Sequence, residues 1–346
     1  MKGKMKVVYL TEPGKMEIAE EPIPEVTPGN ALVRIEYNGI CGSDVHFFKD
    51  GRVGDCVLTD KFVLGHEVSG TVVEVGEGVT NVKAGDRVAL EPGYGCGKCE
   101  YCKTGRYNLC PEMKFFAAPP VSGALKEYVS HPADMCFKLP DNVSTMEGAQ
   151  VEPLAVGLHA ASLGEVSLGQ SVVILGAGCI GLVTLLAAKA RGAAKAVVVD
   201  LFEKRLEFAR NMGADATINA SSENVLERVR EILGDGPDVV FETAGSPATI
   251  AQTSLISKKG GTIVLVGMSA QSEISYNFYQ IMQKEVTIKC VFRYRNLYPV
   301  AIAAISSGRI NVKQIVTHEF TLEQSNEAFS TVVEDAQNVV KGIIKM

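Results

Sequence analysis

The sequence predicts an α/β protein with two domains, a mostly antiparallel β domain and a doubly wound parallel sheet. Its 346 residues exceed what one hydrophobic core usually serves. The first part of the chain is rich in glycine, proline and short β-branched segments, whereas strands and helices alternate after it. We predict that the first domain covers residues 1–153, completed by about 293–346, and that the second covers residues 154–292.

Short β-branched segments predict the strands of the first domain. Ala31–Glu36, Val68–Val75 and Asp86–Ala89 are each bounded by glycine or proline. The tail adds an apolar helix at Tyr298–Ser306 and an amphipathic helix at Leu322–Glu334. We expect part of this tail to pack against the first domain.

The second domain is predicted from alternating apolar strands and helices. In order these are strand Ser171–Leu175, a glycine turn and a helix, strand Ala196–Asp200, a helix from Glu203, strand Thr217–Ile218, helix Glu223–Leu233, strand Asp238–Glu242, a helix from Pro247, and strands Thr262–Gly267 and Val286–Val291. Such spacing is typical of βαβ units, whose right-handed crossovers cover both faces of a parallel sheet with helices.

Composition narrows the class of partner. The chain is 46% hydrophobic and 21% charged, with a net charge of −6 and no long basic run. Nucleic acids and anionic membrane surfaces favour clustered Lys and Arg, so we expect neither as a partner. The first ten residues lack the apolar run of a signal peptide, and no apolar stretch is long enough to span a bilayer. We therefore expect a cytoplasmic protein whose nine cysteines form no disulfide framework.

A glycine fingerprint between two predicted strands indicates a dinucleotide site. Gly176, Gly178 and Gly181 follow one strand and open a helix, so the turn is tight and backbone N–H groups face the pyrophosphate. The next strand ends at Asp200, whose carboxylate suits two ribose hydroxyls and repels a 2′-phosphate. NAD is therefore favoured over NADP, and Arg205 is expected to flank the adenine.

Four cysteines, Cys96, Cys99, Cys102 and Cys110, have the spacing C-x2-C-x2-C-x7-C. The last gap is longer than in a ferredoxin run, and no second cluster set is present, which argues against an iron–sulfur centre. Four thiolates in a turn-rich lobe suit tetrahedral zinc. Because four cysteines close the coordination sphere, we predict a structural zinc and expect the chemistry elsewhere.

Other segments carry metal-ligand side chains together with a family signature. Gly65-His66-Glu67 is followed by Gly70, Gly76 and Val79 at the spacing of the zinc-containing medium-chain dehydrogenase/reductase superfamily. The segment 41–46, the four-cysteine lobe and the glycine fingerprint also occur in that superfamily's order. The sequence resembles its polyol branch, the sorbitol (L-iditol 2-) and xylitol dehydrogenases. That narrower resemblance rests on residues 108–109, 115–120, 151–160 and 291–302.

The resemblance implies a GroES-like mostly-β catalytic domain and a Rossmann coenzyme domain. It further implies an NAD-dependent oxidoreductase with two zinc ions per subunit, which reversibly oxidises a secondary hydroxyl of a polyol such as sorbitol, xylitol or L-iditol to a ketose. The catalytic zinc would be held by Cys41, His66 and Glu67. Glu152 would lie beside it, and whether Glu67 or Glu152 is the direct third protein ligand stays open. A homotetramer is implied as well.

The resemblance also assigns residues to each function. Ser43, Glu152 and His46 would carry the proton toward solvent, because imidazole exchanges protons near neutral pH. The predicted substrate residues are Ser43, Phe116, Glu152, Arg293 and Tyr294. The predicted cofactor-binding residues are Gly176, Gly178, Ile180, Gly181, Asp200, Arg205, Val266, Gly267, Met268, Val291, Phe292 and Arg293.

Two alternatives remain open. Threonine 3-dehydrogenase and sugar-alcohol phosphate dehydrogenases share the same signature, and Arg293 and Arg295 are compatible with a phosphorylated substrate. A non-catalytic relative is the other alternative. His159 is expected to pack within a helix rather than bind metal, and Cys56, Cys136, Cys179 and Cys290 are expected to be core or incidental thiols.

Overall fold

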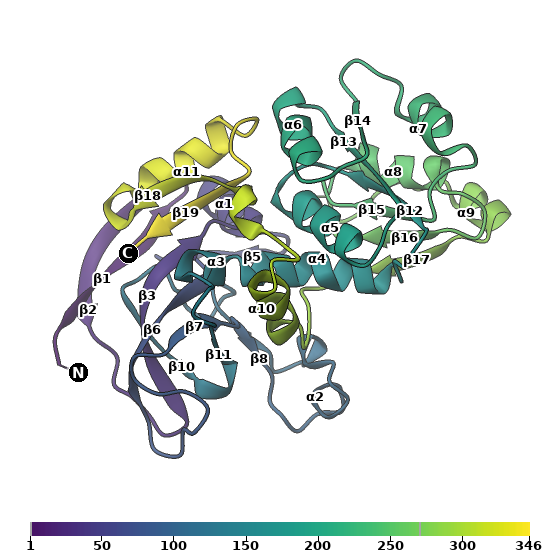
Figure 1. Ribbon diagram of the computed structural model, residues 1–346. Helices are drawn as coiled ribbons and strands as arrows, with labels where there is room; N and C mark the ends of the chain where they lie inside the picture. The colour runs from purple at the N-terminus through teal and green to yellow at the C-terminus, as the bar shows by residue number, and fades with distance from the viewer. Residues whose placement is uncertain (1, 270) are drawn as a thin grey trace. The chain divides into compact units, whose positions relative to one another are not determined.

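The computed structural model describes residues 2–269 and 271–346, and the chain divides into two compact units (Figure 1). The first unit consists of Met1–Glu152 together with Tyr298–Met346. The second consists of Pro153–Leu297. Helix α4 (Val151–Leu163) begins in the first unit and continues in the second. Among the described residues, no helix has both the length and the apolar character needed to cross a bilayer.

The first unit is built around one mostly antiparallel sheet, in the order β11-β7-β6-β3-β19-β18, with β10 also paired to β3. Its strands are β3 (Asn30–Gly39), β6 (Glu67–Val75), β7 (Arg87–Leu90), β10 (Tyr128–Pro132), β11 (Cys136–Lys138), β18 (Val316–Thr321) and β19 (Lys341–Lys345). The parallel pair is β18 with β19. Strand β19 comes from the tail of the chain and pairs with β3, so the tail contributes to this sheet.

Short elements surround this sheet. They are β1 (Lys4–Glu12), β2 (Lys15–Pro22), α1 (Gly42–Asp50), β4 (Arg52–Val53), β5 (Cys56–Val57), β8 (Gly93–Tyr94), α2 (Glu100–Lys103), η1 (Tyr107–Leu109), β9 (Lys114–Phe115), η2 (Ala133–Met135), α3 (Thr145–Ala149), α10 (Tyr298–Ser306), η3 (Val312–Ile315), η4 (Leu322–Gln324) and α11 (Ser325–Glu334). The side chains of Val33, Val68 and Leu90, one from each of β3, β6 and β7, are buried in one core cluster. Alternate residues of a strand face the same side, so each of these strands contributes one face to this core.

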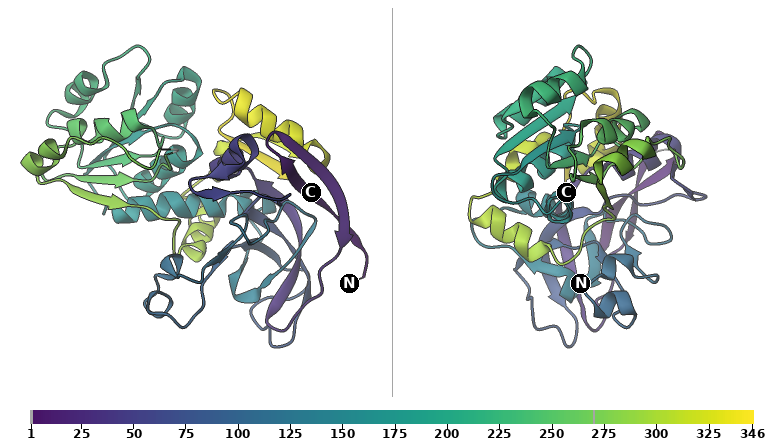
Figure 2. Two further views of the ribbon diagram at one scale, coloured as in Figure 1. Left: turned by 180° about the vertical axis from the view of Figure 1, so that it is seen from behind. Right: turned by 90° about the vertical axis from the view of Figure 1, so that its right-hand side faces the viewer.

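The second unit is a six-stranded parallel sheet in the order β14-β13-β12-β15-β16-β17. Its strands are β12 (Ser171–Leu175), β13 (Lys195–Asp200), β14 (Ala216–Asn219), β15 (Val239–Glu242), β16 (Thr262–Leu265) and β17 (Thr287–Cys290). Its helices are α5 (Cys179–Ala190), α6 (Glu203–Asn211), α7 (Val225–Leu233), α8 (Pro247–Ile256) and α9 (Phe278–Lys284). Figures 1 and 2 show helices on both sides of this sheet. The predicted doubly wound parallel sheet is therefore confirmed.

Several element boundaries differ from the sequence prediction by a few residues, and three of these differences have clear local reasons. Helix α7 begins at Val225 because the Asn224 side chain accepts hydrogen bonds from the first free N–H groups and caps the helix. Strand β16 ends at Leu265, since the next two N–H groups both donate to the carbonyl of Glu242. The helix predicted over 322–334 is a 3₁₀ turn followed by α11.

Candidate functional site

Cys41, His66 and Glu67 converge at one end of the main sheet of the first unit. Strand β3 ends at Gly39, which pairs with Glu67 at the start of the antiparallel strand β6. Cys41 therefore lies next to the segment that carries the other two residues. One ligand atom from each side chain lies within 4.8 Å of the others. The imidazole and carboxylate are buried, and the thiol is half-buried.

Asp44 holds the two halves of this cluster together. It is 1% exposed, and its carboxylate accepts hydrogen bonds from the N–H of Cys41 at 3.3 Å and of Gly65 at 3.2 Å. The same carboxylate lies 3.5 Å from Nδ1 of His66. Sequence analysis did not assign Asp44 to the site. Its position in the first turn of a helix that starts after Cys41 is a signal that could have done so.

The negative charges around His66 favour a cation in this cluster. Burial lowers the pKa of His66, but the charges of Asp44 and Cys41 outweigh it and leave the pKa well above its ordinary value. Among the described residues, no group hydrogen-bonds to the buried Nδ1. A thiolate, an imidazole and a carboxylate are a donor set that zinc favours. The three residues therefore fit a zinc ion.

Glu67 forms a buried ion pair with Lys341, which sequence analysis missed. The carboxylate is fully buried, and Nζ of Lys341 lies 2.8 and 2.7 Å from its two oxygens. A Cβ at Gly39 would come within 2.1 Å of one of these oxygens, so only glycine leaves room for them. Lys341 lies 274 positions beyond Glu67, and no local pattern links the two residues.

The remaining predicted catalytic residues lie elsewhere in the first unit. Glu152 is buried in α4, outside the three-residue group. Burial raises the pKa of the Glu91 carboxyl, and the charge of Glu152 adds to this shift. Ser43 is half-buried in α1. His46 is on the same helix, with its side chain 42% exposed and Nδ1 3.6 Å from Asp50. This exposure suits an exit to solvent, and the predicted roles of these residues stay predictions.

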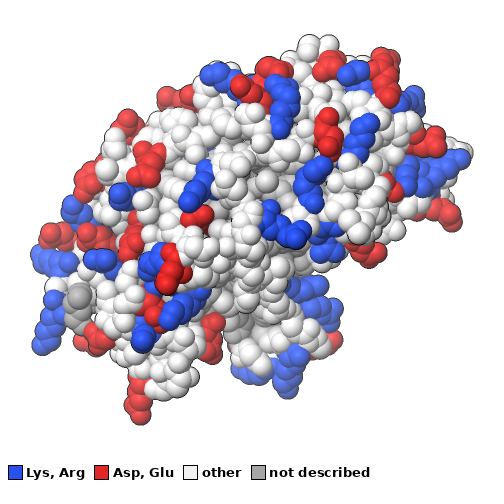
Figure 3. Space-filling model, viewed as in Figure 1, with Lys and Arg blue, Asp and Glu red and all other residues white. Residues whose placement is uncertain are grey.

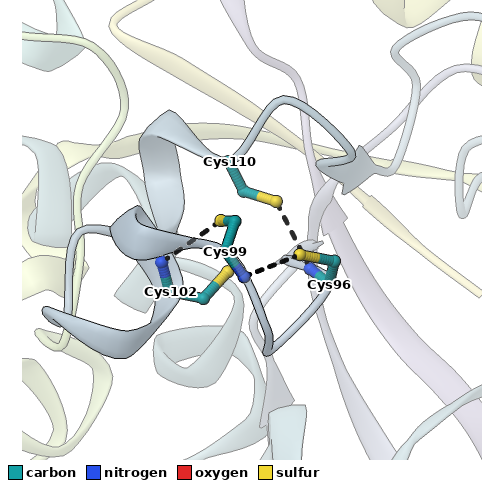
Figure 4. Close-up of side chains that lie close together, drawn as sticks. All are labelled: Cys96, Cys99, Cys102 and Cys110. Carbon is teal, nitrogen blue, oxygen red and sulfur yellow. Dashed lines mark hydrogen bonds between the residues drawn. The ribbon is translucent and has the colours of Figure 1, made fainter.

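The four cysteines of the lobe between β8 and β9 point toward one another (Figure 4). Their sulfur atoms lie within 4.8 Å of one another. Backbone N–H groups donate hydrogen bonds to three of the sulfurs, at 3.3 to 3.5 Å. The N–H of Cys96 donates to Sγ of Cys110, the N–H of Cys99 to Sγ of Cys96, and the N–H of Cys102 to Sγ of Cys99. These donors stabilise thiolates, and the four sulfurs fit a tetrahedral metal ion.

No disulfide joins the nine cysteines, all of which lie in the described residues. Of the thiols expected to be core or incidental, Cys136 is buried, Cys56 and Cys179 are half-buried, and Cys290 is exposed. His159 is buried in α4, as expected. Burial and the nearby charge of Arg295 lower its pKa to about 4.

The glycine turn of the second unit lies where its strand order reverses. Strand β12 neighbours both β13 and β15, so the turn after β12 opens at the crevice where such sheets bind nucleotides. A Cβ at Gly181 would lie 1.9 Å from the carbonyl oxygen of Gly176, which explains the need for glycine there. Gly178 caps α5, and a Cβ there would contact only the guanidinium of Arg205 at 3.7 Å. The turn therefore fits a dinucleotide pyrophosphate.

Asp200 ends β13 and faces this turn. Its carboxylate accepts hydrogen bonds from the N–H of Ala177 at 2.7 Å and of Phe202 at 2.9 Å. Ile180 is in the first turn of α5. The other predicted cofactor residues follow the carboxyl ends of β16 and β17, the edge where ligands bind such sheets; they are Val266, Gly267, Met268, Val291, Phe292 and Arg293.

The predicted substrate residues belong to both units. Phe116 is buried in the first unit, where its ring centroid lies 4.6 Å from that of His131. In the second unit, Tyr294 is 3% exposed and the guanidinium of Arg293 lies 4.9 Å from the ring centroid of Phe292. Their shared role in substrate binding stays a prediction.

Known proteins resemble the whole chain. Residues 27–141 match the alcohol dehydrogenase GroES-like domain, and residues 179–307 match the zinc-binding dehydrogenase family. An uncharacterized zinc-type alcohol dehydrogenase-like protein of Escherichia coli strain K12 is 47% identical over 99% of both chains. The sorbitol dehydrogenase of Gallus gallus is 46% identical over 95% of this chain and 93% of its own.

Solved structures of dehydrogenases resemble the whole chain as well. An E. coli oxidoreductase of unknown specificity has a TM-score of 0.95 at 46% identity, over 99% of each chain. A putative zinc-binding dehydrogenase of Sinorhizobium meliloti bound to NADP has a TM-score of 0.92 at 30% identity, over 99% of this chain and 100% of its own. An E. coli alcohol dehydrogenase complexed with NADH has a TM-score of 0.92 at 29% identity, over 99% of each chain. The chain therefore belongs to the zinc-dependent medium-chain dehydrogenase/reductase family.

Proposed function

We propose that this protein is a zinc- and NAD-dependent polyol dehydrogenase, which reversibly oxidises a secondary hydroxyl of sorbitol, xylitol or L-iditol to the ketose. The convergence of Cys41, His66 and Glu67 carries the proposal, because these donors leave room for a substrate oxygen as a further ligand. The similarity to sorbitol dehydrogenases supports the polyol substrate.

Within this proposal the chain's own side chains orient the reactants and move the proton. When bound, zinc acts as a Lewis acid on the hydroxyl, and NAD accepts the hydride. Cys41, His66 and Glu67 would hold the metal of the active site, and the four cysteines of the lobe would hold a second, structural metal. Ser43 and Glu152 would take up the hydroxyl proton through water, and His46 would release it to solvent. Arg293 and Tyr294 would donate hydrogen bonds to the other hydroxyls beside the apolar wall of Phe116.

Asp200 supports NAD as the cofactor. Its carboxylate lies at the end of β13 beside the glycine turn, where it would accept both ribose hydroxyls and repel a 2′-phosphate. Relatives with solved structures bind NADP in one case and NADH in the other, so this local charge is the observation that favours NAD.

A substrate panel tests the proposal. The zinc-loaded protein is incubated with NAD or NADP and with xylitol, sorbitol, ribitol, galactitol 1-phosphate or threonine, and nicotinamide reduction is followed by absorbance. We expect reduction of NAD with a free polyol. Activity with the phosphorylated polyol or threonine alone would favour the other dehydrogenases of the family, and no reduction with any free polyol would overturn the proposal.

We further propose that the protein is a homo-oligomer, a tetramer by resemblance, with a small molecule as its other partner. Strand β17 is at the edge of its sheet and exposes Ile288, and α9 exposes Phe278, Tyr279 and Met282. Exposed apolar side chains beside an open strand edge favour contact with another chain. Acidic and basic side chains are interspersed on the face shown in Figure 3, which does not favour a nucleic acid or membrane surface.

A further inference from the structure

Lys341 is a buried ammonium group that makes three hydrogen bonds. It is 3% exposed and lies at the start of β19. Its Nζ donates to both carboxylate oxygens of Glu67, at 2.8 and 2.7 Å, and to the carbonyl oxygen of Ile40 at 2.9 Å. An ammonium group has three N–H donors, so this geometry satisfies all of them.

These contacts reach two members of the metal cluster. Glu67 is contacted directly, and each of its oxygens keeps one lone-pair direction for another partner. The bond to Ile40 fixes the carbonyl that immediately precedes Cys41. The position of the lysine is set by the sheet, because Ile343 of β19 pairs with Gly39 of β3.

The ammonium also changes the charge that a metal ion would experience. The thiolate of Cys41 and the carboxylate of Glu67 carry two negative charges, which a divalent cation alone would neutralise. Asp44 adds a third buried negative charge, which the positive charge of Lys341 offsets, so the assembly with a divalent cation is neutral. Without the lysine it would be one unit negative. The lysine therefore favours a further anion at the metal, either the carboxylate of Glu152 or an ionised hydroxyl.

We propose that Lys341 is a positioning residue that restricts Glu67 to one-oxygen contact with the metal and thereby reserves an anion position there. This inference rests on the proposed zinc site and addresses which carboxylate completes it. With Lys341 in place, Glu67 is a weakened ligand and Glu152 becomes the exchangeable carboxylate. Without the lysine, both oxygens of Glu67 are released toward the metal, and the reserved position is filled.

Cobalt substitution tests the inference on the full-length protein. Co²⁺ replaces the metal held by Cys41, His66 and Glu67 while zinc stays in the lobe, and the visible spectrum reports the coordination number. We expect Lys341→Met to keep its metal content but to show weaker absorption, typical of a higher coordination number. Lys341→Arg keeps the charge and should retain the parent spectrum, whereas Cys41→Ser should lose the signal and so identifies its source.

The outcomes separate this inference from the proposed function. We expect kcat of Lys341→Met to fall about 10- to 100-fold, with metal content unchanged. A parent-like cobalt spectrum in that variant, or loss of its metal, would overturn the inference and leave the polyol activity of the parent unaffected. A changed spectrum in a protein without polyol activity would overturn the proposed function instead. Lys341→Gln, which keeps an N–H donor but not the charge, carries the test if the methionine variant does not fold.

Discussion

Nε2 of His131 lies 2.8 Å from the backbone carbonyl oxygen of Glu91, and these two buried residues have pKa values shifted in opposite directions. Burial raises the pKa of Glu91 to about 7; the hydrogen bond from Tyr107 opposes this shift and the charge of Glu152 adds to it. Burial lowers the pKa of His131 to about 4, against the hydrogen bond with the Glu91 carbonyl. Both residues therefore favour their neutral forms in the folded protein.

Glu91→Gln should stabilise the protein at high pH. The unfolded carboxyl, with its ordinary pKa of 4.5, releases its proton before the folded one, so Glu91 removes stability as the pH rises from 4.5 through about 7. Relative to the parent, the free energy of unfolding of the variant should be higher by on the order of 1–3 kcal/mol at pH 8 and almost unchanged at pH 4.5. Urea unfolding at several pH values measures the difference. A difference independent of pH would refute this account of Glu91.

His131→Asn should have the opposite pH dependence. The unfolded imidazole takes up a proton below its ordinary pKa of 6.5, but the folded one does so only near 4, so the parent loses stability as the pH falls through this window. The variant loses packing against Tyr94 and Phe116 at every pH, but it should not show this additional loss. Urea unfolding at several pH values measures this difference as well. If the free energy of unfolding of the variant fell with decreasing pH as steeply as that of the parent, the prediction would be wrong.

Cys102→Ser and Cys41→Ser should affect different metals. Each variant should bind about one zinc where the parent binds two, because each lacks one ligand of a separate cluster. Cys102→Ser should lower the melting temperature and keep kcat within about tenfold per remaining metal, whereas Cys41→Ser should abolish turnover and still bind NADH. Metal analysis, thermal unfolding and NADH fluorescence test the pair. Full activity of Cys41→Ser would exclude it as a ligand of the reactive metal.

Asp200→Ser should weaken NAD selectively. The loss of a charged acceptor for the ribose hydroxyls should raise the KM for NAD by about 10- to 100-fold, a change of roughly 1–3 kcal/mol. The KM for NADP should change less or improve, since the repulsion of its 2′-phosphate is removed. Steady-state kinetics with both cofactors gives the ratio, and an unchanged preference would show that Asp200 does not select the cofactor.

Ile288→Lys should disrupt the proposed oligomer. The substitution places a charge on the exposed edge strand β17, and charges on an open edge oppose strand pairing. Light scattering after gel filtration should give a smaller mass than for the parent. Leu168→Lys is the matched control, because Leu168 is 86% exposed but lies outside any strand. Equal masses for the two variants would locate the interface elsewhere.

Local patterns in the sequence were sufficient for the fold but only partly for the site. The strand Ser171–Leu175 was predicted at its observed bounds, because an apolar run before a glycine turn has few other solutions. Cys41 and His66 are weak signals singly and gain weight only together with the other motifs, and the structure brings them together through the pairing of β3 with β6. Lys341 was not predictable, since its function depends on a strand pairing that no segment encodes alone.

The insertion of β19 between β3 and β18 has a consequence for the protein's synthesis. Residues 341–345 leave the ribosome only after the whole second unit, whose residues 153–297 are contiguous and able to fold as they emerge. Until residues 341–345 emerge, residues 37–39 of β3 lack their pairing with β19, and Glu67 lacks its ion pair with Lys341. The metal cluster is therefore among the last features of the nascent chain to mature, although all three of its ligand residues are made within the first 70 residues.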